Sequence, residues 1–113
     1  MLQIYHNPRC RKSREGLAFL QESGKEFEII AYLENTPTKQ ELQDLLHKLG
    51  YTPIDLVRTN EAIWKENFKG KVLTDDMIID AMIHHPKLIE RPIVVSKDKA
   101  VVGRPPEKIK DLL

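Results

Sequence analysis

The chain has 113 residues, of which 41% are hydrophobic and 31% are charged, and it carries a single cysteine. This composition is typical of one soluble globular domain, and it excludes collagen-like, low-complexity and intrinsically disordered chains. No apolar stretch approaches the roughly 18 residues of a membrane span, and residues 1–5 are too short and polar for a signal peptide. Because a lone unpaired thiol is unusual in secreted proteins, we expect a cytoplasmic protein without membrane contact.

The formal net charge of +1 argues against the broad basic surface that nucleic-acid binding requires. Positive charge is instead local, since four cations stand within residues 9–14 and the rest of the chain therefore carries −3. We expect no nucleic-acid partner, and a positive environment for Cys10, which lies inside this cluster. The four cations are Arg9, Arg11, Lys12 and Arg14.

The first part of the chain predicts a β-α-β arrangement. Residues 2–5 predict a short strand, a turn follows at 6–8, and a helix begins at residue 10 or 11 and ends at residue 22. A second strand is predicted at 27–32, where the nearly continuous apolar run is typical of a parallel strand buried on both faces. A right-handed crossover places Cys10 between the carboxyl end of the first strand and the start of the helix.

Between residues 35 and 86 the pattern is wholly helical. Thr38 and Glu41 form the two ends of a capping box, and Thr52 precedes a proline that begins a short helix carrying residues 56–58. Another helical stretch holds residues 62–64. Thr74 caps a further helix, whose predicted inner stripe consists of Met77, Ile78, Ala81 and Met82.

The last part of the chain predicts a β-hairpin with strands at 91–95 and 99–102, and then a C-terminal helix that begins near Pro105. The order β-α-β, helices, β-β-α resembles a thioredoxin-like fold. We therefore expect an α/β domain spanning 1–113 with a mixed four-stranded sheet, and a helical insertion at about 35–87.

The chemistry of Cys10 depends on whether its surroundings favour the thiolate, which is the reactive form. A helix amino terminus and the basic neighbours both lower the pKa of a thiol. Ser13 offers a hydroxyl to the sulfur, and His6 offers a hydrogen bond or a charge. The alternative interpretation is that Cys10 is a small buried hydrophobic residue, because cysteine is among the most buried residue types.

Several other kinds of site are excluded by spacing. A cysteine phosphatase loop needs an arginine six places after the cysteine, where Gly16 stands, and an internal dithiol is impossible because Ser13 replaces the second cysteine. We expect no metal site, because His84 and His85 are adjacent and no ligand spacing for zinc is present. The acidic residues that follow Thr74 are interpreted as complements to the helix dipole.

Beyond residue 14 the chain uses eleven lysines but only three arginines, namely Arg58, Arg91 and Arg104. Where lysine would serve on a wet surface, arginine adds a planar fork that binds oxyanions through two bonds. These arginines are therefore candidates for oxyanion binding. The alternative is that they form ordinary surface ion pairs, which are common and weak.

The segments His6-Asn7-Pro8-Arg9-Cys10, Arg91-Pro92-Ile93-Val94-Val95 and Gly103-Arg104-Pro105, with Ser13 three places after the cysteine, resemble the glutaredoxin-coupled arsenate reductase family. The similarity covers essentially all 113 residues. It implies that Cys10 attacks arsenate, that His6 and Ser13 stabilise its thiolate, and that Pro92 is a cis-proline facing the thiol. It further assigns oxyanion binding to Arg58, Arg91 and Arg104.

The resemblance also implies glutathione as a co-substrate, glutaredoxin as the partner that completes the cycle, and no bound cofactor. We expect a monomer. Arg11 and Lys12 depart from the small residues that the family usually has between the cysteine and the serine. Two alternatives therefore remain on the same fold: a glutathione-dependent thiol oxidoreductase, or a redox-sensing regulator without arsenate activity. Such regulators usually carry a second cysteine, which Ser13 replaces.

Overall fold

The computed structural model describes residues 1–113 and divides into two compact units. The sheet unit comprises Met1–Asn35 and Arg91–Leu113, and the helical unit comprises Thr36–Glu90. The insertion predicted at 35–87 thus corresponds to a unit that ends at Glu90. The longest helix has 12 residues, and none of the helices has the length and apolar character of a membrane span.

The sheet unit contains the predicted mixed sheet, with strands in the order β2-β1-β3-β4. The strands are β1 (Leu2–Tyr5), β2 (Phe27–Ile30), β3 (Ile93–Val95) and β4 (Ala100–Val102). Strand β1 pairs parallel with β2 and antiparallel with β3, and β3 pairs antiparallel with β4. The α/β thioredoxin-like arrangement is confirmed, and the chain leaves the carboxyl end of β1 near the centre of the sheet.

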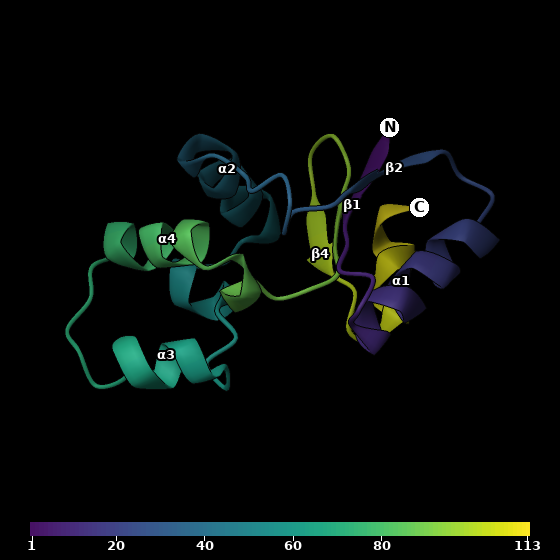
Figure 1. The fold of residues 1–113 in the computed structure, drawn as a ribbon. Helices are drawn as coiled ribbons and strands as arrows, with labels where there is room; N and C mark the ends of the chain where they lie inside the picture. Colours follow the sequence, from purple (N-terminus) through teal and green to yellow (C-terminus); the bar gives the residue numbers. More distant parts are fainter. The chain divides into compact units, whose positions relative to one another are not determined.

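One face of this sheet packs against α1 (Arg11–Glu22) and the C-terminal 3-10 helix η3 (Pro106–Leu112), which lie side by side (Figure 1). Burial of each aliphatic side chain in this layer contributes about 1.5–3 kcal/mol. The helix is therefore held firmly against the strand that precedes it. The core cluster in this layer consists of four fully buried residues, Ile4, Leu20, Val94 and Ile109.

The prediction for β2 was partly wrong. The strand ends at Ile30, two residues early, and the Tyr32 N–H donates to the Ile30 carbonyl (3.0 Å), so the chain turns there. β2 is an edge strand rather than a doubly buried one, and Ile29 is 49% exposed. An apolar run records side-chain type but not how many neighbouring strands pair with it, and β2 pairs only with β1.

In the helical unit, α4 runs between α2 and α3 (Figure 1). The capping box before α2 is confirmed, since Thr38 Oγ1 accepts the Glu41 N–H at 3.1 Å and Glu41 Oε1 accepts the Thr38 N–H at 3.0 Å. Thr74 caps α4 in the same way through the Met77 N–H (3.2 Å). The elements are α2 (Lys39–Leu49), η1 (Pro53–Leu56), α3 (Ala62–Asn67), α4 (Asp75–His84) and η2 (Pro86–Leu88).

The inner stripe predicted for α4 requires one correction. Met77 is 49% exposed, whereas Ile79 is buried together with the other three predicted positions. Helix α4 contacts α2, η1 and η2, and contact with several elements buries a wider arc than a single stripe. Met77 lies in the first turn of α4, and its side chain falls outside that arc.

Candidate active site

Cys10 occupies the N-cap position of α1 and is the last residue of a closed turn. The Cys10 N–H donates to the Asn7 carbonyl (3.0 Å), and the Arg9 N–H donates to Asn7 Oδ1 (3.0 Å). Asparagine favours such turns because its side chain accepts from the backbone two residues on. The turn presents a partly exposed, free thiol at the start of the helix. No side chain caps α1, so the first backbone N–H groups of the helix, next to the thiol, donate to no capping side chain.

Ser13 is fully buried, although it lies in the first turn of α1. Its Oγ lies 2.6 Å from His6 Nδ1 and accepts the Asn7 N–H at 2.9 Å. The sequence predicted a bond from this hydroxyl to the sulfur, but the hydroxyl is occupied by His6 and Asn7. The group of Ser13 that acts on Cys10 is its backbone N–H. The side chain therefore ties the thiol loop to the helix.

His6 follows β1 and is 7% exposed. Burial lowers the pKa of its imidazole, a hydrogen bond with the Ser13 backbone raises it, and the charge of Arg14 lowers it again, so the pKa lies below its usual value. His6 is therefore a neutral ring at neutral pH. Of the two contributions expected from the sequence, it supplies a hydrogen bond within the loop and no positive charge.

Arg91 and Arg104 come from the other end of the chain and meet at the thiol. Arg104 Nη2 lies 3.8 Å from Cys10 Sγ, and Arg104 Nε donates to the Arg91 carbonyl at 2.8 Å. The hairpin explains this meeting, because β3 and β4 pair antiparallel and bring the residues before β3 close to those after β4. The Arg91–Pro92 and Arg104–Pro105 peptide bonds are both cis. Pro92 thus has the conformation that the resemblance implies.

The surroundings of Cys10 lower the pKa of its thiol. Burial alone raises the pKa, but this effect is outweighed by the Ser13 N–H, by the hydrogen bond and charge of the Arg91 guanidinium, and by the Lys12 N–H. Both backbone donors belong to the first turn of α1. The site therefore contains a nucleophile that is ionised more readily than an ordinary cysteine.

Arg91 also has an unpaired hydrogen-bond donor, because its Nε is buried and has no acceptor in the protein. Leaving a buried charged donor unpaired costs about 1–3 kcal/mol or more, so such groups require an explanation. An anionic ligand next to the sulfur would supply the missing acceptor. Arg91 and Arg104 therefore place two guanidinium groups beside Cys10, one of which has a buried N–H without an acceptor.

Arg58 lies in the helical unit, in extended backbone after η1 rather than in the predicted short helix. Val57 forms a bridge with Ile89, and the Arg58 N–H donates to the Leu88 carbonyl at 2.7 Å. The Arg58 guanidinium forms an ion pair with Glu61, with Nη1 and Oε1 3.1 Å apart. The other six predicted residues all lie within the sheet unit, and the role of Arg58 in the site stays a prediction.

Two features of the site were missed from the sequence. Arg14 Nη1 donates to the Pro8 carbonyl (2.9 Å), which fixes the loop before the thiol. Gly16 packs so closely on Pro92 that a Cβ at this position would lie 2.6 Å from Pro92 Cγ. A glycine in the interior of a helix was the available signal, since it costs stability unless a close contact requires it.

A hollow of about 280 Å³ borders the thiol loop, between residues 6–9 and the segment after β2. Arg9, Leu33 and Glu34 are exposed around it, which places a cation, an apolar side chain and a carboxylate on one rim. Such a combination suits a small ligand that carries both charges. No group of three or more His, Cys, Asp or Glu side chains is arranged to hold a metal ion.

Comparisons with known proteins agree with this architecture. A model of the ArsC family matches residues 5–112. An uncharacterised Escherichia coli K12 protein, YfgD, is 46% identical over 99% of this chain and 96% of its own length, and an arsenate reductase of Neisseria meningitidis serogroup A is 40% identical over 99% and 97%. The structure of an arsenate reductase from Vibrio cholerae matches with a TM-score of 0.94 and 46% identity over 99% and 97%. Because these matches include the sheet, the thiol loop and the hairpin described above, the chain belongs to the ArsC family.

Proposed function

We propose that this protein reduces arsenate to arsenite, with the Cys10 thiolate as the nucleophile and with glutathione and glutaredoxin as the source of electrons. The observation that carries the proposal is the placement of two guanidinium groups, Arg91 and Arg104, on a thiol whose pKa is lowered. Relatives named arsenate reductases that are 40–41% identical over nearly the whole chain support the same substrate.

The proposed reaction balances with two thiols for each arsenate. The Cys10 thiolate forms a bond to arsenic, and one arsenate oxygen leaves as water after protonation. Glutathione thiolate then attacks the Cys10 sulfur. The sulfur–arsenic bond breaks with its electron pair going to arsenic, which releases arsenite and leaves a mixed disulfide. A glutaredoxin thiolate takes the glutathione from this disulfide and frees Cys10 for another cycle.

The roles of the remaining residues follow from the charges that develop. Arg91 and Arg104 bind the oxyanion and stabilise the negative charge on it as oxygen leaves, and Arg58 is proposed as the third cation. His6 and Ser13 hold the turn so that the first N–H groups of α1 stay directed at the sulfur. Pro92 fixes the peptide next to Arg91.

Glutathione is proposed as co-substrate because the single cysteine cannot complete a disulfide within the chain. The hollow next to the thiol loop supports this, since Arg9 and Glu34 offer partners for the carboxylates and the ammonium group of that peptide. We propose that the protein works as a monomer in the reducing cytoplasm without a bound cofactor.

The test is NADPH oxidation in a coupled mixture of arsenate, glutathione, glutaredoxin and glutathione reductase. We expect turnover that depends on arsenate and that disappears in the Cys10→Ser protein. Oxidation of NADPH at the same rate with and without arsenate would overturn the proposal. If the thiol then still titrates below its usual pKa, a glutathione-dependent oxidoreductase or a redox-sensing regulator becomes the better interpretation.

A further inference from the structure

Glu61 stands at the N-cap of α3, but it does not cap that helix. Its backbone has the extended conformation of an N-cap residue, and its side chain makes no bond to the first turn. Threonine side chains fill the corresponding positions of α2 and α4 and do accept such bonds. An unmade cap typically costs about 1 kcal/mol. The side chain of Glu61 is therefore used for something other than the stability of α3.

The partner of Glu61 is Arg58, and the backbone between them brings the two side chains together. The Glu61 N–H donates to the Arg58 carbonyl (3.0 Å), which closes the turn, and Oε1 lies 3.1 Å from Arg58 Nη1. The two side chains are 23% and 32% exposed. By contrast, Arg11 pairs with Glu15 on α1 while its side chain is 84% exposed, as in an ordinary surface ion pair.

Every bond of the Arg58 side chain is made by one nitrogen. Nη1 donates to Glu61 and, at 3.4 Å, to the Lys87 carbonyl. Nε and Nη2 have no acceptor in the protein, and neither is among the buried polar atoms that lack a partner. These two groups form the parallel fork with which a guanidinium binds an oxyanion through two bonds. Arg58 therefore presents its fork to ligands while its other edge is fastened.

We propose that Glu61 is a positioning residue that orients the Nε–Nη2 fork of Arg58 toward an incoming oxyanion. The inference rests on the proposed function, in which Arg58 binds arsenate. A guanidinium at the end of four rotatable bonds would otherwise sample many directions, and fixing it beforehand lowers the entropy lost on binding. Glu61 acts from the edge that the ligand does not use, so its negative charge is shielded by the guanidinium between them.

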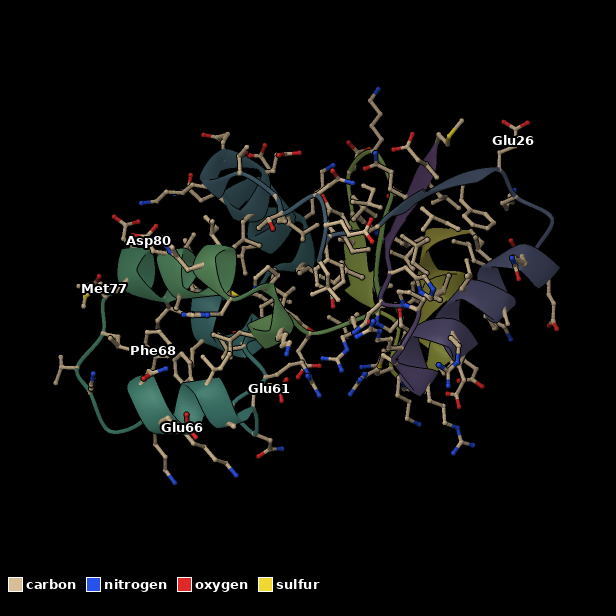
Figure 2. All side chains as sticks on the ribbon, viewed as in Figure 1. Glu26, Glu61, Glu66, Phe68, Met77 and Asp80 are labelled. Carbon is tan, nitrogen blue, oxygen red and sulfur yellow. The ribbon has the colours of Figure 1, made fainter.

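The test compares Glu61→Ala, Glu61→Gln and, as a control, Glu66→Gln. Glu66 is an exposed residue farther along the same helix (Figure 2), and it belongs to none of the ion pairs of the structure. In the coupled arsenate assay, Glu61→Ala should lower kcat/KM by on the order of tenfold, chiefly through a higher KM. Glu61→Gln keeps an oxygen acceptor for Nη1 and should recover most of this loss, and Glu66→Gln should behave like the wild type.

A second readout does not depend on turnover. The Nε–H resonance of Arg58, identified by its absence in Arg58→Lys, should shift saturably with sulfate in the wild type and much less in Glu61→Ala. An unchanged KM and an unchanged sulfate titration in Glu61→Ala would overturn the proposal. A lower KM in both Glu61 variants would overturn it too, because Glu61 would then be a competitor for Arg58.

The two proposals can fail separately. A wild-type protein without arsenate-dependent turnover would remove the proposed function, and the sulfate titration would still decide the role of Glu61. If Glu61→Ala does not fold, Glu61→Ser takes its place, because its short hydroxyl can cap α3 but cannot reach Arg58 Nη1. A weaker sulfate response in Glu61→Ser than in Glu61→Gln supports positioning, and an equal or tighter response contradicts it.

Discussion

Helices α1 and α2 both begin at an N-cap residue with extended backbone, but the two helix ends serve different purposes. At α2, Thr38 and Glu41 satisfy each other's backbone N–H groups, so the helix end is closed by its own side chains. At α1, Cys10 makes no cap bond, and Ser13, in the position that corresponds to Glu41, turns its hydroxyl inward to His6. The N–H groups that a cap would satisfy are left to the thiol. The residue at the N-cap thus decides whether the free N–H groups of a helix start are bonded by a cap, as at Thr38, or remain available to a thiol, as at Cys10.

The largest effect is expected from the removal of Arg91. Its guanidinium supplies, beside the uncapped start of α1, the positive charge that stabilises the Cys10 thiolate. Because Arg91 lowers the pKa of Cys10 and carries an unpaired Nε, Arg91→Ala should reduce arsenate turnover by about 10²–10³-fold. The rate of alkylation of Cys10 by iodoacetamide, measured against pH, should have a higher midpoint than in the wild type. Lys97→Ala, in the exposed hairpin turn, is the control and should change neither value.

The same titration gives a stability prediction. In the folded state the pKa of Cys10 lies below that of the unfolded chain, so the thiolate form favours folding. Its contribution is fully present above the unfolded pKa and is lost as the pH falls through the folded pKa. At high pH, the denaturant midpoint should therefore fall when Cys10 is changed to Ser, and this fall should be smaller in an Arg91→Ala background than in the wild-type background. An equal fall in both backgrounds would contradict the role of Arg91.

A smaller effect is expected from Ser13→Ala, which separates the hydroxyl from the backbone N–H. Loss of the hydroxyl leaves the Asn7 N–H without an acceptor and frees His6, so we expect a loss of about 1–3 kcal/mol in unfolding free energy. The midpoint of Cys10 alkylation should rise less than in Arg91→Ala, because the Ser13 N–H remains. A rise as large as that of Arg91→Ala would show that the hydroxyl acts on the sulfur directly. Ser23→Ala, at the other end of α1, is the matched control.

The smallest effect belongs to the closed helix end. Thr38→Ala removes one half of the capping box and should lower the free energy of unfolding by about 1 kcal/mol, measured by urea denaturation. Arsenate turnover and the alkylation midpoint of Cys10 should stay at their wild-type values. A change in either would mean that the start of α2 is coupled to the thiol, and the contrast between the two helices would then fail.

Local patterns in the sequence predicted much of this molecule. The capping box at Thr38, the β-α-β start and the hairpin depend on residues near one another in the chain, and all three are present. Features that depend on distant partners were missed. The edge position of β2 and the burial of Ile79 in place of Met77 follow from how many elements pack around them, which periodicity does not record.

The candidate site shows the same division. The position of Cys10 at the start of α1 follows from local sequence. Arg91 and Arg104 were singled out because arginine is rare beyond residue 14 of this chain. The hydroxyl of Ser13 took a different partner because His6 lies within reach only after the strand and helix pack. The ion pair of Arg58 with Glu61 was likewise hidden, since a residue three places on is a partner only if the backbone turns between them.

The contact between Gly16 and Pro92 has a consequence for how this sequence can drift over evolutionary time. Even the smallest side chain at position 16 would overlap the proline ring, and a Cβ at Gly103 would lie 3.2 Å from the same ring and from Ile109. The absence of side chains at Gly16 and Gly103 therefore allows α1, the segment around Pro92 and η3 to pack together. Exposed charges such as Arg11 and Lys12 have no such neighbours. In a library of variants selected for growth on arsenate, position 16 should be nearly invariant while positions 11 and 12 vary widely.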